Sequence, residues 1–176
     1  MTGGWAMADH AVLILCTGNS ARTILGEALV GALPGFTAFS AGSQPKGTPH
    51  PMAIEVLADN GFETGAFRSK SWDEFGEGVR GAPKLDSVIT VCDSAAAETC
   101  PLWMGAPVRA HWGLPDPAAV SGSEADVRAA FDATFDALKA RAARLGALPV
   151  AAMSAAELQA ALTAIGRMDH VDGHVA

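Results

Sequence analysis

The chain has 176 residues, of which 49% are hydrophobic and 18% charged, so it is expected to fold as one globular domain. Its formal net charge of −7 argues against a nucleic-acid partner, and no apolar run reaches the roughly 18–20 residues that a membrane span needs. Residues 1–10 lack a basic stretch followed by an apolar core, which predicts a flexible lead-in and a cytoplasmic protein. The three cysteines are then expected to stay reduced, without a permanent disulfide framework.

Short apolar segments alternate with segments of helical periodicity. Strands are predicted at 11–15, 36–40, 87–91 and 107–111, and helices at 21–33, 50–60 and 123–145. A short helix is predicted over 70–76, with Ser71 and Glu74 as its capping box, and Ser154 opens a last helix that ends near Ile165. This alternation predicts an α/β fold with a mainly parallel sheet covered on both faces.

The predicted strands place three reactive side chains near one another. Cys16 ends the first strand, Cys92 ends the third, and Asp116 lies just past the fourth. Ligands of such sheets bind beyond the carboxyl ends of the strands. We therefore expect Cys16, Cys92 and Asp116 to gather along this edge.

The segment Cys16-Thr-Gly-Asn-Ser-Ala-Arg22 joins the first predicted strand to the first predicted helix. Inward-pointing backbone N–H groups and the helix N-terminus would hold a tetrahedral anion, and Arg22 would close the ring with a planar fork of donors. The same environment would keep Cys16 as the thiolate nucleophile; the alternative is a buried structural cysteine. The expected oxyanion-binding residues are Thr17, Gly18, Asn19, Ser20, Ala21, Arg22 and Thr23.

The stretch VLILCTGNSART, residues 12–23, resembles the signature loop of the low-molecular-weight tyrosine phosphatase superfamily. The similarity continues through Ser40-Ala-Gly42, Arg68-Ser-Lys-Ser-Trp72 and Asp116-Pro117. It implies a three-layer sandwich in which helices flank a four-stranded, mainly parallel sheet, with Cys16 as nucleophile. Many members have a cysteine where this chain has Ala21 and a serine where it has Thr23. The threonine keeps the hydroxyl group of that serine.

The resemblance also divides the chain. It implies a catalytic domain over residues 11–146, after the lead-in 1–10, and leaves a C-terminal helical extension over 147–176. Some members bind a monovalent cation near the positions of Asn19 and Glu27. A Glu27 that faces solvent on its helix is the simpler expectation here, and we expect neither a metal nor a cofactor.

Cys92 and Cys100 bear on the choice of activity. Their spacing alone is explained equally well by a thiol relay with Cys16 and by two unrelated buried cysteines, and the small and polar residues between them favour a mobile loop. Residues 91–103 and 111–118 also resemble the thiol-relay arsenate reductases. That resemblance implies that Cys16, Cys92 and Cys100 form a redox relay, that Arg22 binds the oxyanion, and that Asp116 is the general acid.

The expected function is therefore reduction of arsenate, with phosphate or sulfate as a mimic and with thioredoxin or glutathione/glutaredoxin as the reductant. The alternative is a low-molecular-weight tyrosine phosphatase that hydrolyses phosphate monoesters. Those phosphatases usually carry an aromatic residue after the Asp-Pro pair, whereas this chain has Ala118 and contains no tyrosine. A third possibility is an oxyanion-binding module without catalysis.

Overall fold

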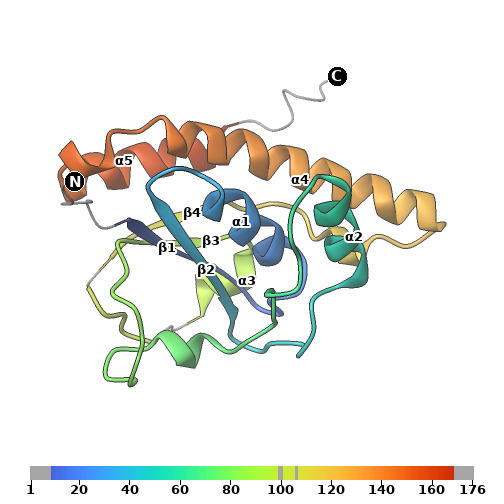
Figure 1. Ribbon diagram of the computed structural model, residues 1–176, viewed down its shortest axis with the longest axis horizontal. Helices are drawn as coiled ribbons and strands as arrows, with labels where there is room; N and C mark the ends of the chain where they lie inside the picture. Colours follow the sequence, from blue (N-terminus) through green and yellow to red (C-terminus); the bar gives the residue numbers. More distant parts are fainter. Residues whose placement is uncertain (1–8, 99–100, 106, 169–176) are drawn as a thin grey trace, which may run out of the picture.

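Four parallel strands form the central sheet of the computed structural model, which describes residues 9–98, 101–105 and 107–168 (Figure 1). Across the sheet they are β2 (Phe36–Gly42), β1 (His10–Cys16), β3 (Ser87–Thr90) and β4 (Val108–His111). The register pairs Cys16 with Gly42 and Leu15 with Thr90. The expected α/β fold with a four-stranded parallel sheet is confirmed, and the carboxyl ends of β1 and β3 lie side by side.

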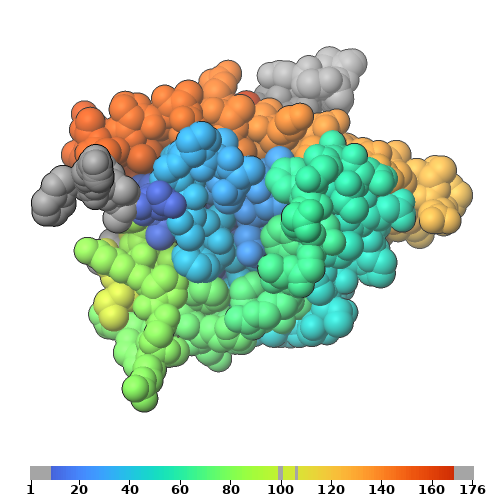
Figure 2. Space-filling view, viewed as in Figure 1, coloured from blue at the N-terminus to red at the C-terminus, as the bar shows by residue number. Residues whose placement is uncertain are grey.

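Helices cover the sheet. They are α1 (Arg22–Gly31), α2 (Pro51–Asp59), α3 (Asp93–Ala97), α4 (Glu124–Gly146) and α5 (Ala155–Gly166), with 3₁₀ turns η1 (Trp72–Phe75), η2 (Pro117–Ala119) and η3 (Val150–Ala152). Figure 2 shows α4, in yellow-orange to orange, along one long side of the molecule, and Figure 1 shows α5, in red-orange, on the same side. None of these described helices is both long and apolar enough to cross a membrane.

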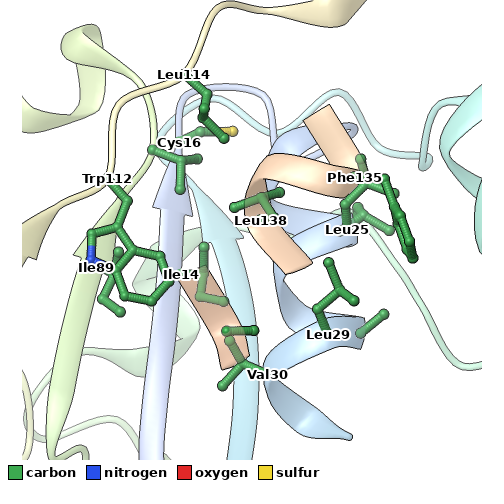
Figure 3. Close-up of a cluster of buried hydrophobic side chains, with 14 of the residues drawn as sticks. Ile14, Cys16, Leu25, Leu29, Val30, Ile89, Trp112, Leu114, Phe135 and Leu138 are labelled. Carbon is green, nitrogen blue, oxygen red and sulfur yellow. The ribbon is translucent and has the colours of Figure 1, made fainter. Parts of the chain in front are cut away.

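The alternation of side chains along β1 separates two cores. Val12, Ile14 and Cys16 join the cluster built with α1, α2, α4 and α5, as Figure 3 shows for Ile14 and Cys16. Leu13 and Leu15 face the opposite side, where they pack with a second cluster that includes Trp72, Phe75 and Trp103. Because successive strand residues point to opposite faces, the position of Cys16 at the end of β1 places its sulfur on the helical face.

Two segments differ from their predicted structure. The predicted helix over 70–76 is only the 3₁₀ turn η1, in which Ser71 is the N-cap as predicted but Glu74 pairs with Arg68 instead of completing a capping box. The predicted loop after Cys92 begins as helix α3, in which Cys92 is the N-cap and its Sγ accepts a hydrogen bond from the N–H of Ala95 at 3.4 Å. The alanine run 95–97 favours the helix, since alanine has the highest helix propensity.

Helix α5 protects the edge strand β4. The Gln159 side chain bonds both the backbone N–H and the carbonyl of Arg109, and the indole Nε1 of Trp112 donates to the Leu162 carbonyl at 3.0 Å. Trp112 is buried, with 1% of its surface exposed, so its ring packs in the core. These contacts satisfy polar groups of an edge that would otherwise be open to pairing with another strand.

Candidate oxyanion site

Cys16 lies at the junction of β1 and α1, and 4% of its surface is exposed. Its Sγ accepts a hydrogen bond from the backbone N–H of Asn19 at 3.2 Å and lies 3.7 Å from the Thr23 hydroxyl. The loop turns sharply because Asn19 adopts the left-handed conformation, with φ at 45°. The Thr23 hydroxyl is the one that contacts the sulfur, whereas Ser20 lines the adjoining cavity.

The buried side chain of Asn19 braces the loop. Its amide nitrogen donates to Thr23 Oγ1 at 2.8 Å and to Ser40 Oγ at 3.0 Å, and its carbonyl oxygen accepts from the Lys70 N–H at 2.8 Å. Gly42 permits this arrangement, because a Cβ there would collide with the Thr17 carbonyl. The motifs around Ser40 and Lys70 are thus structural supports of the loop.

Arg22 and Asp116 meet at the same edge of the sheet. Arg22 Nη1 donates to the Leu114 carbonyl at 2.8 Å, and its Nη2 lies 3.7 Å from Asp116 Oδ2. The other carboxylate oxygen, Oδ1, accepts from the Ala118 N–H at 2.9 Å at the start of η2. This cap fixes the orientation of the carboxylate and leaves Oδ2 beside the guanidinium.

Cys92 lies beside Cys16 although the two are far apart in the sequence. Both cysteines line the same cavity, and Cys92 Sγ lies 3.7 Å from the Thr17 hydroxyl, on the residue that follows Cys16. The interaction between the two thiols, helped by the Ala95 N–H, lowers the pKa of Cys92 to about 5, and the same interaction together with burial raises the pKa of Cys16. The pair thus shares one proton, and its first ionisation belongs to both sulfurs.

These groups surround a cavity of about 360 Å³. Its lining residues are Cys16, Thr17, Gly18, Ser20, Ala21, Arg22, Gln44, Lys46, Cys92, Ser94, Asp116 and Ala118. No aromatic ring is among them, and Arg22 and Lys46 supply two cations. The cavity therefore suits a compact tetrahedral anion better than an aryl group.

The structure thus brings Cys16, Arg22, Cys92 and Asp116 together, as the strand ends predicted. Cys100, the third cysteine of the expected relay, lies outside the described residues. No sequence pattern indicated that Gln44 and Lys46 would line this cavity, because their position depends on how the loop after β2 folds back over Gly18. The backbone N–H of Lys46 donates to the Gly18 carbonyl at 2.9 Å.

The expectation of a solvent-facing Glu27 is wrong. Glu27 accepts a hydrogen bond from the Ser40 hydroxyl at 2.5 Å and lies 3.8 Å from Lys70 Nζ. Burial raises the pKa of Glu27 and lowers that of Lys70, and the charge of each partner opposes these shifts. An ammonium group thus already lies beside Glu27, next to the hydrogen bonds that hold Asn19.

His111 at the end of β4 connects to the segment that carries Cys92. Its Nδ1 pairs with the Thr90 hydroxyl at 2.7 Å and its Nε2 with Asp93 Oδ1 at 2.9 Å. Asp93 is the first residue of α3 and follows Cys92 directly. The imidazole therefore ties the start of α3 to the sheet.

A family model described as low molecular weight phosphotyrosine protein phosphatase matches residues 11–160. The chain belongs to this family. Two curated relatives are named arsenate reductase. That of Bacillus licheniformis is 31% identical over 140 residues, which are 78% of this chain and 96% of the relative. That of Halalkalibacterium halodurans is 29% identical over 137 residues, which are 77% of this chain and 94% of the relative.

Solved structures share the fold of this phosphatase-family chain. An arsenate reductase in a phosphate-binding state matches with a TM-score of 0.60 at 22% identity, over 78% of this chain and 97% of the other. The Escherichia coli K30 tyrosine phosphatase Wzb, in complex with sulphate, matches with a TM-score of 0.58 at 24% identity, over 80% and 97%. The fold alone therefore accommodates both named activities, and the side chains of the site must distinguish them.

Proposed function

We propose that this phosphatase-family protein is an arsenate reductase. The observation that carries the proposal is that Cys92 and Cys16 line the same cavity, with Cys92 Sγ 3.7 Å from the hydroxyl of Thr17, the residue next to Cys16. Hydrolysis of a phosphate ester requires water at that position, whereas reduction requires a second sulfur. The curated relatives named arsenate reductase, which cover about three quarters of the chain, support the same choice.

In the first step, arsenate binds to the N–H groups of the loop 17–23 and to Arg22. The Cys16 thiolate attacks arsenic, and Asp116 donates a proton to the departing oxygen, which leaves as water. The proton shared with Cys92 allows Cys16 to ionise without a separate base. Asp116 is suited to its task because Oδ2 lies beside Arg22, where the oxyanion binds.

In the second step, the proton that Cys92 took from Cys16 passes to the Asp116 carboxylate left by the first step, and the Cys92 thiolate attacks Cys16 Sγ. A sulfur–sulfur bond forms, the sulfur–arsenic bond breaks, and its electron pair passes to arsenic, which leaves as arsenite. Two thiols are oxidised while arsenic(V) becomes arsenic(III). Cys92 Sγ accepts a hydrogen bond from the Ala95 N–H and lies near the Thr17 hydroxyl. Both contacts stabilise the thiolate that this step needs.

In the third step, Cys100 attacks Cys92, so that Cys16 returns to the thiolate and a Cys92–Cys100 disulfide remains. Disulfide formation requires Cα atoms within about 7 Å, so we expect the segment between Cys92 and Cys100 to rearrange for this step. A dithiol such as thioredoxin, or glutathione with glutaredoxin, then reduces the enzyme. A thioredoxin-dependent arsenate reductase of Corynebacterium glutamicum has the same fold, with a TM-score of 0.57 at 22% identity over 80% of this chain and 61% of that one.

The phosphatase alternative shares Cys16, Arg22 and Asp116 and differs in what attacks the adduct. Ala118 lines the cavity in place of an aromatic wall, which disfavours aryl phosphates as substrates. A slow aryl-phosphatase activity is still expected, because the first step is chemically the same. Such hydrolysis would not depend on Cys92 or Cys100.

The decisive experiment is to incubate the reduced protein with arsenate in the absence of any reductant and to map its disulfides by peptide mass spectrometry. One arsenite per molecule together with a Cys92–Cys100 bond is the expected result. A Cys16–Cys92 bond would show that the relay stops at its second step. Fully reduced protein without arsenite, combined with hydrolysis of aryl phosphate, would identify a phosphatase.

A further inference from the structure

Lys46 lies at the mouth of the cavity, on the loop that follows β2. Its side chain runs across Gly18, where a Cβ would come within 3.2 Å of Lys46 Cε and 3.5 Å of Cδ. Lys46 also lines the cavity together with Gln44, Cys92 and Asp116. The absence of a side chain at Gly18 thus leaves room for an ammonium group above the loop.

The charges of the site explain why a second cation matters. The guanidinium of Arg22 lies 3.7 Å from Asp116, and the Cys16/Cys92 pair carries one negative charge at neutral pH. A dianion would therefore meet one cation, which already lies beside a carboxyl group, and an anionic sulfur pair, in a chain with a formal net charge of −7. Within the described part of the chain, no carboxylate lies within 4.0 Å of Lys46 Nζ, so its charge is available to a ligand.

We propose that Lys46 is a substrate-binding residue that supplies the second cation for the tetrahedral dianion. It pairs with an oxygen that projects from the loop toward the mouth, while the backbone N–H groups and Arg22 hold the other oxygens. This proposal deepens the arsenate reductase proposal and rests on it for the identity of the substrate. Since the ammonium binds arsenate in ground and transition states alike, it lowers KM and leaves kcat nearly unchanged.

The backbone and the side chain of Lys46 can be separated experimentally. The backbone N–H holds Gly18 at 2.9 Å in any variant other than proline, so a substitution of the side chain leaves the loop anchored. Lys46→Met keeps most of the apolar stem and removes the charge, and Lys46→Arg restores a cation. Lys139→Met, on the exposed face of α4 and outside the cavity, changes the net charge equally and is the matched control.

The test measures arsenate reduction and competitive inhibition by phosphate for these three variants. Lys46→Met should raise both the KM for arsenate and the Ki for phosphate about three- to tenfold, as expected for one partly exposed charge pair, with kcat within about twofold. Lys46→Arg and Lys139→Met should stay within about twofold of the parent. The difference should shrink at about 0.5 M salt, which screens exposed charges. Constants for Lys46→Met equal to those of Lys139→Met would overturn the proposal.

A second readout does not require arsenate reduction. Phosphate should protect Cys16 from alkylation by iodoacetamide, and Lys46→Met should need about three to ten times more phosphate for the same protection. If no variant produced arsenite but this difference remained, the proposed activity would fail while the role of Lys46 in binding the anion would stand. If arsenite were produced and protection were identical in Lys46→Met and the parent, Lys46 would have no such role.

Discussion

The backbone N–H of Asn19 donates to Cys16 Sγ across 3.2 Å, from a residue whose φ of 45° lies in the left-handed region. The side chain of Asn19 makes this unusual conformation stable, because its amide bonds Thr23, Ser40 and the backbone of Lys70. The thiol environment therefore depends on a buried amide whose three partners come from three different segments of the chain.

Asn19→Ala should lose these hydrogen bonds. It should also force an alanine into the left-handed backbone conformation, with no polar side chain to stabilise it. We expect the free energy of unfolding to fall by about 3 kcal/mol and alkylation of Cys16 to slow at neutral pH. Urea unfolding and iodoacetamide kinetics measure the two effects. Asn19→Gly relieves only the backbone strain, so its free energy of unfolding should be about 1 kcal/mol higher than that of Asn19→Ala. Equal stability of the two variants would show that the left-handed conformation of residue 19 costs no stability.

The shared proton of Cys16 and Cys92 predicts an unusual thiol titration. The Cys100→Ser variant serves as the background, and absorbance at 240 nm measures thiolate formation. One thiolate should form with a midpoint near the Cys92 pKa of about 5, and no second thiolate should form at moderately alkaline pH. Cys16→Ala in the same background removes the hydrogen-bond donor, so the remaining midpoint should rise toward the ordinary value of 9.0. Two ordinary thiol titrations in the parent would refute the contact.

The same pair predicts how stability depends on pH. Between about 5 and 9.0 the folded pair has lost a proton that the unfolded thiols keep, so the free energy of unfolding should rise with pH across this window. Above 9.0 both unfolded thiols ionise while folded Cys16, whose pKa is raised, stays protonated, so stability should fall again. Urea titrations of the parent and of the Cys16→Ser/Cys92→Ser double variant, which should lack both slopes, measure the effect.

Cys92→Ser should stop the reaction after the adduct with arsenate has formed. We expect no multiple turnover and no arsenite release, with phosphate protection of Cys16 within about threefold of the parent, because the loop and Arg22 remain. Rapid-mixing measurements of arsenite and intact-protein mass spectrometry provide the readout. Continued turnover in Cys92→Ser would exclude the relay, whereas Ser94→Ala at the same cavity should leave turnover nearly unchanged.

Asp116→Asn should impair the protonation of the leaving oxygen and spare the binding of the anion. The variant keeps a cap on η2, since the amide oxygen can still accept from the Ala118 N–H. Single-turnover arsenate reduction should slow by about 10²–10⁴-fold. Phosphate binding should be unchanged or tighter, because the negative charge beside Arg22 is gone; a rate equal to that of the parent would remove Asp116 from the chemistry.

Loss of one partner of the Glu27–Lys70 ion pair should destabilise the fold more than loss of both. The side chains are 20% and 7% exposed, so Lys70→Met leaves a largely buried carboxylate without its cation and should reduce the free energy of unfolding by about 3 kcal/mol. Glu27→Gln/Lys70→Met should recover much of that loss, because neither charge remains. A double-mutant cycle in urea measures the coupling, and additive losses would show that the two side chains act independently.

The loop 16–22, the parallel sheet and the placement of Asp116 were predictable from the sequence because they depend on local signals. An apolar strand, a loop with Gly18 and Arg22, and a helical pattern follow one another along the chain. The residue Asp116 follows a predicted strand, and all parallel strands bring their carboxyl ends to one edge. Helix α3 was missed because small residues are compatible with both a loop and a short helix, and the N-cap contact of Cys92 decides between them.

The amino-acid sequence by itself thus determined which groups bind an oxyanion and which groups attack it. Tertiary packing decided which of them act on one another. It placed the Cys92 sulfur against Cys16, turned Glu27 toward Lys70 and brought Lys46 over Gly18. Each of these pairs joins segments that are distant in sequence, so its geometry follows from strand register and side-chain packing and not from any local pattern.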